Sequence, residues 1–248
     1  MKNTLIILVI IFGFVLNNNS SKSKSLNTDI SQQTISINSS FTGKKILLFG
    51  NREVNGEIVI EISGPNEIIV VHQKKKIFGI WINSKKITFS NVPSYYALVS
   101  SKPINDLISK PLQKKLLIGS INLPIHAEHN KKFYKAEIEN FKKGLIRNKE
   151  RMNLYLNNEN AIKFNDKLFR GEINFPTNTS EGSYKINTYL IDNNTIIDKQ
   201  EKSIFISKVG LERNIYNLAN DNPALYGFLA IVIAVVAGFL ASIVFRRI

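Results

Sequence analysis

The sequence predicts a mainly β protein: an immunoglobulin-like, sandwich-type exported region with one bridging helix, followed by one C-terminal transmembrane helix. Short runs rich in β-branched and aromatic residues follow one another between residues 34 and 99, with turn signals between them. The apolar residues change to helical spacing between residues 128 and 155. An uncharged apolar run at residues 224–245 is long enough to cross a bilayer.

The N-terminus predicts an export signal over residues 1–20. Lys2 precedes an apolar run from Leu5 to Leu16, and a polar tract begins at Asn17. Such a run has the length of a signal-peptide core and is too short to span a membrane. The alternatives are an uncleaved anchor and a buried N-terminal strand. Residues 21–33 are rich in Ser, Lys, Asn and Gln, which predicts a flexible leader.

A first β-rich domain is expected at residues 34–102. Within it Ile58, Ile60 and Ile62 alternate with Glu57 and Glu61, which is the period of a strand with one buried face. A Gly-Pro pair at residues 64–65 gives a turn after that run. The other strand-like runs are 34–37, 45–49, 67–72, 77–83, 87–89 and 95–99.

Residues 103–160 are expected to form a linker and an amphipathic helix. The apolar residues of that helix fall at steps of four, three, four and seven, so they share one face that is expected to pack against a sheet. These residues are Tyr134, Ile138, Phe141, Leu145 and Met152. Residues 161–210 return to strand patterns. They predict a second β-rich unit, either a small sandwich of its own or extra strands on the first.

The C-terminus predicts a juxtamembrane segment at 211–223, a transmembrane helix at 224–245 and a tail at 246–248. At about 1.5 Å per residue the helix is about 33 Å long, enough to cross a hydrocarbon core of about 30 Å. Arg246 and Arg247 follow it. Basic residues stay in the cytoplasm, so the body is expected on the opposite side of the membrane, as the export signal also predicts.

Small residues recur every fourth position along this helix and lie on one side of it. Ala230, Ala234, Gly238 and Ser242 form this helix-packing face. Small residues let a second helix approach closely in lipid. The expected partners are therefore a polytopic membrane protein or a second copy of the chain.

The composition excludes several kinds of chemistry. The chain has no Cys, which removes disulfides, thiolate metal sites and Cys nucleophiles, and it has only three His. No common nucleophile, phosphate-loop or metalloprotease motif is present in the sequence. We therefore expect no catalytic residue, no cofactor and no metal site, and we expect His126 and His129 to be surface residues.

Lysine doublets and a triplet recur, and the formal net charge is +14. They lie at residues 74–76, 85–86, 114–115, 131–132 and 142–143. Nucleic acid is not an expected partner, because the body is exported. The lysines are expected to keep edge strands soluble, to contact anionic membrane lipid, or to meet an acidic partner.

Trp81, Tyr95 and Tyr96 are candidate anchors, either of the core or of an interface. Trp81 is the single Trp and lies in a β run, so we expect it in the core, where a Trp buries the largest area of any side chain. A deep pocket lined by any of the three, with converging charged groups, would instead indicate a ligand site.

Several segments carry a family resemblance: Phe41-Thr42-Gly43, residues 47–50, 77–83, 92–97, 208–212 and 223–227, and the final Phe245-Arg246-Arg247. With these segments the chain resembles the alphaproteobacterial "putative transmembrane protein" family over nearly the whole exported region and the C-terminal helix. The resemblance implies a bacterial inner-membrane protein with a periplasmic body. It implies no activity, ligand or catalytic residue.

These observations favour a single-pass inner-membrane protein that is not an enzyme. Its periplasmic body would act as an accessory or interaction subunit of a membrane transporter or envelope complex. The alternative is a periplasmic ligand-binding module, or an enzyme without a recognisable catalytic motif. A sorted surface protein is a third class, although Asp221-Asn222-Pro223 replaces the Pro-Glu-Pro that such proteins carry.

Overall fold

The computed structural model describes residues 25–128, 133–209 and 211–246. The expected export signal therefore lies outside the described residues, as do His129 and Arg247. For residues 211–214 and 244–246 the backbone alone is described.

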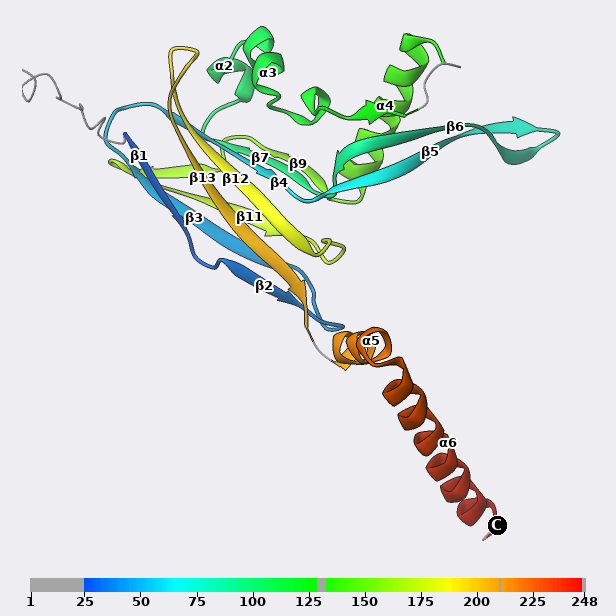
Figure 1. Ribbon diagram of the computed structural model, residues 1–248. Helices are drawn as coiled ribbons and strands as arrows, with labels where there is room; N and C mark the ends of the chain where they lie inside the picture. The colour runs from blue at the N-terminus through cyan, green and yellow to red at the C-terminus, as the bar shows by residue number, and fades with distance from the viewer. Residues whose placement is uncertain (1–24, 129–132, 210, 247–248) are drawn as a thin grey trace, which may run out of the picture.

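Two sheets pack face to face to form the body (Figure 1). The first has the strand order β1-β3-β11-β10 and contains β1 (Leu26–Ile30), β3 (Lys44–Arg52), β11 (Leu168–Phe175) and β10 (Ile162–Asn165). The second has the order β2-β13-β12-β4-β7-β9 and contains β2 (Thr34–Ile37), β13 (Thr195–Lys208), β12 (Gly182–Asp192), β4 (Glu57–Ser63), β7 (Tyr96–Ser100) and β9 (Tyr155–Asn158). Its two edge pairs, β2 with β13 and β7 with β9, are parallel.

The core lies between these sheets. Ile58, Ile60 and Ile62 of β4 are fully buried, as their alternation predicts. A Cβ atom added to Gly171 of β11 would lie 3.0 Å from Cδ1 of Ile60 and 3.9 Å from Cγ1 of Val99. The absence of a side chain at Gly171 therefore lets the first sheet approach β4 and β7 closely.

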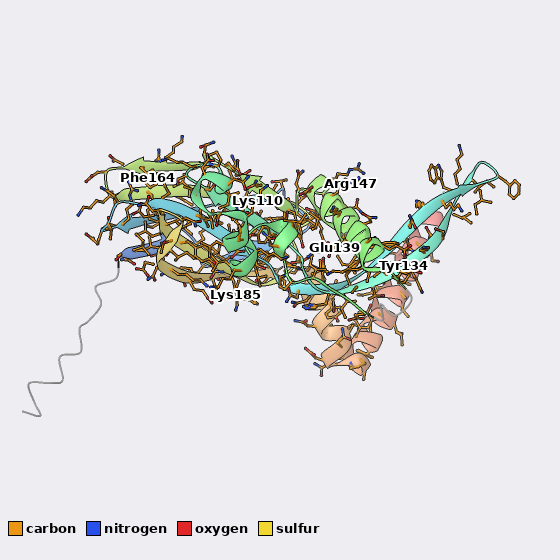
Figure 2. The ribbon with its side chains drawn as sticks, turned by 90° about the horizontal axis from the view of Figure 1, so that it is seen from above. Lys110, Tyr134, Glu139, Arg147, Phe164 and Lys185 are labelled. Carbon is orange, nitrogen blue, oxygen red and sulfur yellow. The ribbon has the colours of Figure 1, made fainter. Side chains whose placement is uncertain are left out.

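A third sheet contains β5 (Asn66–Ile77), β6 (Ile80–Pro93) and the short β8 (His126–Ala127). β5 and β6 form a long hairpin that projects from the sandwich (Figure 1). Three short helical segments follow β7: α2 (Ile104–Leu107), α3 (Lys110–Leu116) and the 3₁₀ turn η1 (Ser120–Asn122). The longer α4 (Lys135–Arg151) lies beside the base of the hairpin (Figure 2).

The expected stripe on α4 packs only at its middle. Phe141 and Leu145 are buried and Ile138 is partly buried, whereas Tyr134 and Met152 at the two ends are exposed. Tyr134 precedes the first turn and Met152 follows the last.

The fold class predicted from the sequence is confirmed: a mainly β sandwich-type body and one C-terminal apolar helix. Two finer expectations are wrong. Residues 26–30 are not a flexible leader, because they form β1, which pairs with β3 and buries Leu26, Thr28 and Ile30. Residues 161–210 do not form a sheet of their own, because β11 pairs with β3 and β12 pairs with β4. The strand pairing supports the alternative, that residues 161–210 add strands to the first unit.

β13 leads into α5 (Leu211–Asp221) and then α6 (Pro223–Arg246) at the end of the body near β2 (Figure 1). Within α6, residues Pro223–Ile243 have a mean hydropathy of 2.5 and are not buried against the body. By length and composition this segment suits a bilayer span.

Candidate functional site

The distal half of the β5–β6 hairpin, residues 72–86, is exposed on both faces. Five consecutive residue steps from His72 to Ile77 extend it by about 17 Å at about 3.4 Å per residue. Phe78 and Gly79 form the two-residue turn at its end, with φ angles of +48° and +86°. Two positive φ angles in a two-residue loop are the geometry that matches the twist of the two strands.

The cross-strand register divides the hairpin tip, residues 77–82, between two faces. Ile77 pairs with Ile80, so these side chains share one face, and Ile82 lies on that face as well because it is two residues along the strand. Trp81 pairs with Lys76 on the other face. Ile80, Trp81 and Ile82 are 69%, 64% and 42% exposed, and Phe78 is fully exposed.

Lysines surround this tip. Lys74, Lys75, Lys76 and Lys86 are exposed, and we call these four residues the basic collar. Lys85 makes an ion pair with Glu137 of α4 at the base of the distal half. The chain has no Asp or Glu between Glu67 and Asp106, so no carboxylate of this segment offsets the collar. The hairpin thus presents an apolar tip with a positively charged collar.

The expectation that Trp81 belongs to the core is wrong. The strand-like run at residues 77–83 spans the turn at Phe78 and Gly79, so it is not one strand: residues 80–83 begin β6 and Ile77 ends β5. No second layer covers this part of either strand, so Trp81 is exposed. The alternative expectation, that Trp81 is an interface anchor, stays a prediction.

Tyr95 is a core residue. Its ring lies 5.2 Å from that of Phe175 on β11 and 5.9 Å from that of Tyr184 on β12, so the cluster joins both sheets. Its hydroxyl donates to the carbonyl of Asn174 at 2.7 Å, which satisfies the one polar atom of the buried side chain.

Tyr96, the first residue of β7, is also buried, but it makes different contacts. Its hydroxyl donates to Glu61 Oε1 at 3.0 Å and accepts from the backbone N–H of Gly119 at 2.7 Å. Glu61 Oε2 accepts from the Tyr189 hydroxyl at 3.1 Å and from Asn187 Nδ2 at 3.3 Å. Burial raises the pKa of the Glu61 carboxyl above its usual range.

The sequence reasoning missed this cluster because it placed Glu61 on a solvent-facing side of β4. Glu61 is 8% exposed, and the segment that carries Gly119 lies over it. The one available signal was Val59, an apolar residue on the same supposedly polar face, which is fully buried.

Tyr96 also lines a cleft of about 420 Å³, together with Gln113, Glu150 and Glu159. A larger open groove of about 790 Å³ lies on the first sheet, at the end of the body opposite the hairpin, where Figure 2 labels Phe164. Phe49, Lys163 and Arg170 line that groove as well. Neither Trp81 nor Tyr95 lines either hollow.

His72 and His126 are exposed on β5 and β8. In the part of the chain that the structure describes, no group of three or more His, Cys, Asp or Glu side chains is placed to hold a metal ion.

The helix-packing face of α6 is exposed along its length. A Cβ atom added to Gly238 would meet no atom within 4 Å, so neither the body nor α5 covers that position.

Fold and surface together define a β-sandwich protein with a membrane-length helix at its C-terminus. The chain belongs to the family described as "Putative transmembrane protein (Alph_Pro_TM)", whose model matches residues 25–247. No functionally curated protein matches the sequence.

Among solved structures the chain is similar to Spo0M, a sporulation control protein from Bacillus subtilis, with 8% sequence identity and a TM-score of 0.28. The match covers 79% of this chain and 54% of that one, so the chain spans about half the length of the solved protein. Similarity at this level supports no conclusion about fold or function.

Proposed function

We propose that the protein is a single-pass inner-membrane protein whose periplasmic β-sandwich body acts without catalysis, as an accessory or interaction subunit of a membrane transporter or envelope complex. The observation that carries this proposal is the separation of anchor and body. α6 is apolar over the length of a bilayer and is unburied in the described structure. Every side of it is therefore available to another helix.

The helix-packing face favours such a contact. Ala230, Ala234, Gly238 and Ser242 advance 400° per step at about 100° per residue, so they remain on one side. In lipid, where burial from water gives no driving force, close packing of small residues drives helix association. The partner is a polytopic protein or a second copy.

Crosslinking in native membranes tests this proposal directly. The chain contains no Cys, so Ala234→Cys introduces a single thiol on the small-residue face. Val236→Cys is the matched control, since two residues rotate the side chain by about 200° at nearly the same depth. We expect a specific adduct at position 234 and none at 236. Equal yields at both positions, or no adduct at either, would mean that α6 is only an anchor.

Orientation needs its own experiment. The arginine pair after α6 supports a cytoplasmic C-terminus. A reporter active only in the periplasm should therefore be active when fused after residue 208, and one active only in the cytoplasm should be active after Ile248. Activity of one reporter type at both positions contradicts the single-pass arrangement.

The Tyr96 cleft favours the second candidate function, a ligand-binding module. Glu150 and Glu159 give that cleft an acidic lining, which suits a cationic small molecule. Such a ligand should raise the unfolding temperature of the native protein and should fail to do so in Ser120→Trp, which fills the cleft from η1.

A further inference from the structure

We propose that the β5–β6 hairpin is a membrane-docking device: its tip, residues 77–82, enters the interface of an anionic lipid bilayer while the basic collar contacts the lipid headgroups. This contact is separate from the one proposed for α6. The evidence for it comes from the shape, charge and backbone conformation of the hairpin.

The shape gives the tip access to a surface. The distal half of the hairpin is exposed on both faces, and Figure 1 shows it extending clear of the sandwich. The turn places Phe78 at the extreme end, with Ile80 and Trp81 directly behind it. Aromatic side chains with an apolar ring and a polar atom, Trp above all, are the residues enriched at the membrane–water interface.

The charge selects the kind of surface. Four exposed lysines of the collar lie within a few residues of the tip, and no acidic residue occurs between Glu67 and Asp106. The interior of a protein partner's interface is depleted of charge and would leave these lysines at its rim. An anionic bilayer satisfies both features at once, because its headgroups meet the lysines while its hydrocarbon boundary receives the apolar tip. Because α6 of the same chain is long enough to cross a bilayer, the hairpin is tethered to a membrane.

The backbone gives an argument that is independent of composition. Phe78 has a φ of +48°, a conformation that a bulky side chain adopts at a cost and that Asn or Gly adopts readily. Its ring gains no packing in return, because it is fully exposed. Folding therefore does not account for Phe at this position, whereas insertion into lipid does.

The single Trp makes the test simple, since Trp81 reports on the tip without a label. The full-length protein is reconstituted into vesicles of phosphatidylcholine alone or of phosphatidylcholine with phosphatidylglycerol. We expect Trp81 emission to shift to shorter wavelengths only in the anionic vesicles, and to be quenched there by lipids brominated in the acyl chains. High salt should reverse both effects.

Phe78→Asn is the decisive variant. It installs an Asn-Gly turn, so the hairpin should fold at least as well, while the ratio of inserted to free tips should fall about tenfold or more through the loss of one buried Phe side chain. Ile121→Asn, at an exposed apolar residue of η1, is the matched control and should leave the Trp81 signal unchanged.

The collar is tested in the same way. Replacing Lys75 and Lys76 by Gln should lower the ratio of inserted to free tips about 25-fold, at about fivefold per lysine. The same replacement at Lys114 and Lys115 of α3 removes equal charge elsewhere and should have little effect. Trp81 emission that is identical in the two kinds of vesicle would overturn the proposal. So would capture of a membrane protein by a crosslinker at the tip with no quenching by lipid, because the occupant would then be a protein.

Discussion

Glu61 shows how one covering segment changes the chemistry of a side chain. On an isolated β4 it would be an ordinary solvent-facing carboxylate, but the segment through Gly119 and the rings of Tyr96 and Tyr189 enclose it. Four hydrogen bonds hold Glu61 and its neighbours together, and each carboxylate oxygen of Glu61 accepts at least one of them. Burial still raises its pKa, because the charged form loses its hydration.

This raised pKa predicts a pH dependence of stability. The folded state binds the Glu61 proton more tightly than the unfolded state, whose pKa is near the ordinary 4.5. The contribution of this group is therefore largest below 4.5 and is lost as pH rises through the raised folded pKa. Denaturant unfolding of wild type and Glu61→Gln across this range should show wild type losing stability relative to the variant. Parallel curves would show that Glu61 keeps its ordinary pKa.

Trp81 and Tyr95 should differ sharply in what they contribute to stability. Trp81→Ala is expected to change the free energy of unfolding by less than about 0.5 kcal/mol, as exposed substitutions do. Tyr95→Ala removes a fully buried ring and should cost about 3–5 kcal/mol. Thermal or denaturant unfolding of the two variants checks both values. A large loss for Trp81→Ala would mean that the hairpin tip packs against another part of the protein.

At the scale of elements, the sequence patterns predicted where several strands lie but not which strands pair with one another. The runs at 34–37 and 57–63 coincide with β2 and β4, because β-branched apolar residues at alternate positions are typical of strands. Alternation within one strand does not show which other strand pairs with it. β3, for example, pairs with β11, which is more than a hundred residues away in the sequence. Alternation also does not show whether anything covers a face. That is why Trp81 was expected inside and Glu61 outside.

β1 was missed although its pattern was readable. Leu26, Thr28 and Ile30 alternate with polar residues, but the Ser- and Lys-rich segment before them favoured a flexible leader. In the structure β1 covers the edge of β3, and the backbone N–H of Leu26 donates to Asp198 of β13 at 3.0 Å. β1 therefore links the first sheet to the second.

Substitutions in β1 should show that it is part of the body. Leu26 is fully buried, so Leu26→Ala is expected to cost about 2–5 kcal/mol. Asn27→Ala, one position away on the exposed face, should be nearly neutral. Unfolding curves of the two variants measure this difference. Equally small losses in the free energy of unfolding would mean that residues 26–30 are a flexible leader and not part of the body.

At the scale of the whole molecule, the N-terminal and C-terminal halves of the body need each other to fold, whereas the body does not need α6. Each sheet of the sandwich contains strands from before residue 101 and strands from after residue 154, paired with one another, so neither half buries its apolar faces alone. α6, in contrast, contributes nothing to the core. The body should therefore keep its stability when the helix is removed, provided that β13 and α5 remain.

Deleting residues 224–248 should therefore release a folded body from the membrane. We expect its unfolding temperature to match that of the full-length protein, because the deleted helix buries no part of it. The hairpin predicts one complication: at low salt some of the truncated protein should still sediment with anionic membranes through the basic collar, and high salt should release it. Phe78→Asn in the same truncation should abolish this residual binding without lowering the unfolding temperature. Retention that withstands both high salt and Phe78→Asn would mean that a different surface of the body holds it at the membrane, and the open groove around Phe49 and Phe164 would be the first surface to examine.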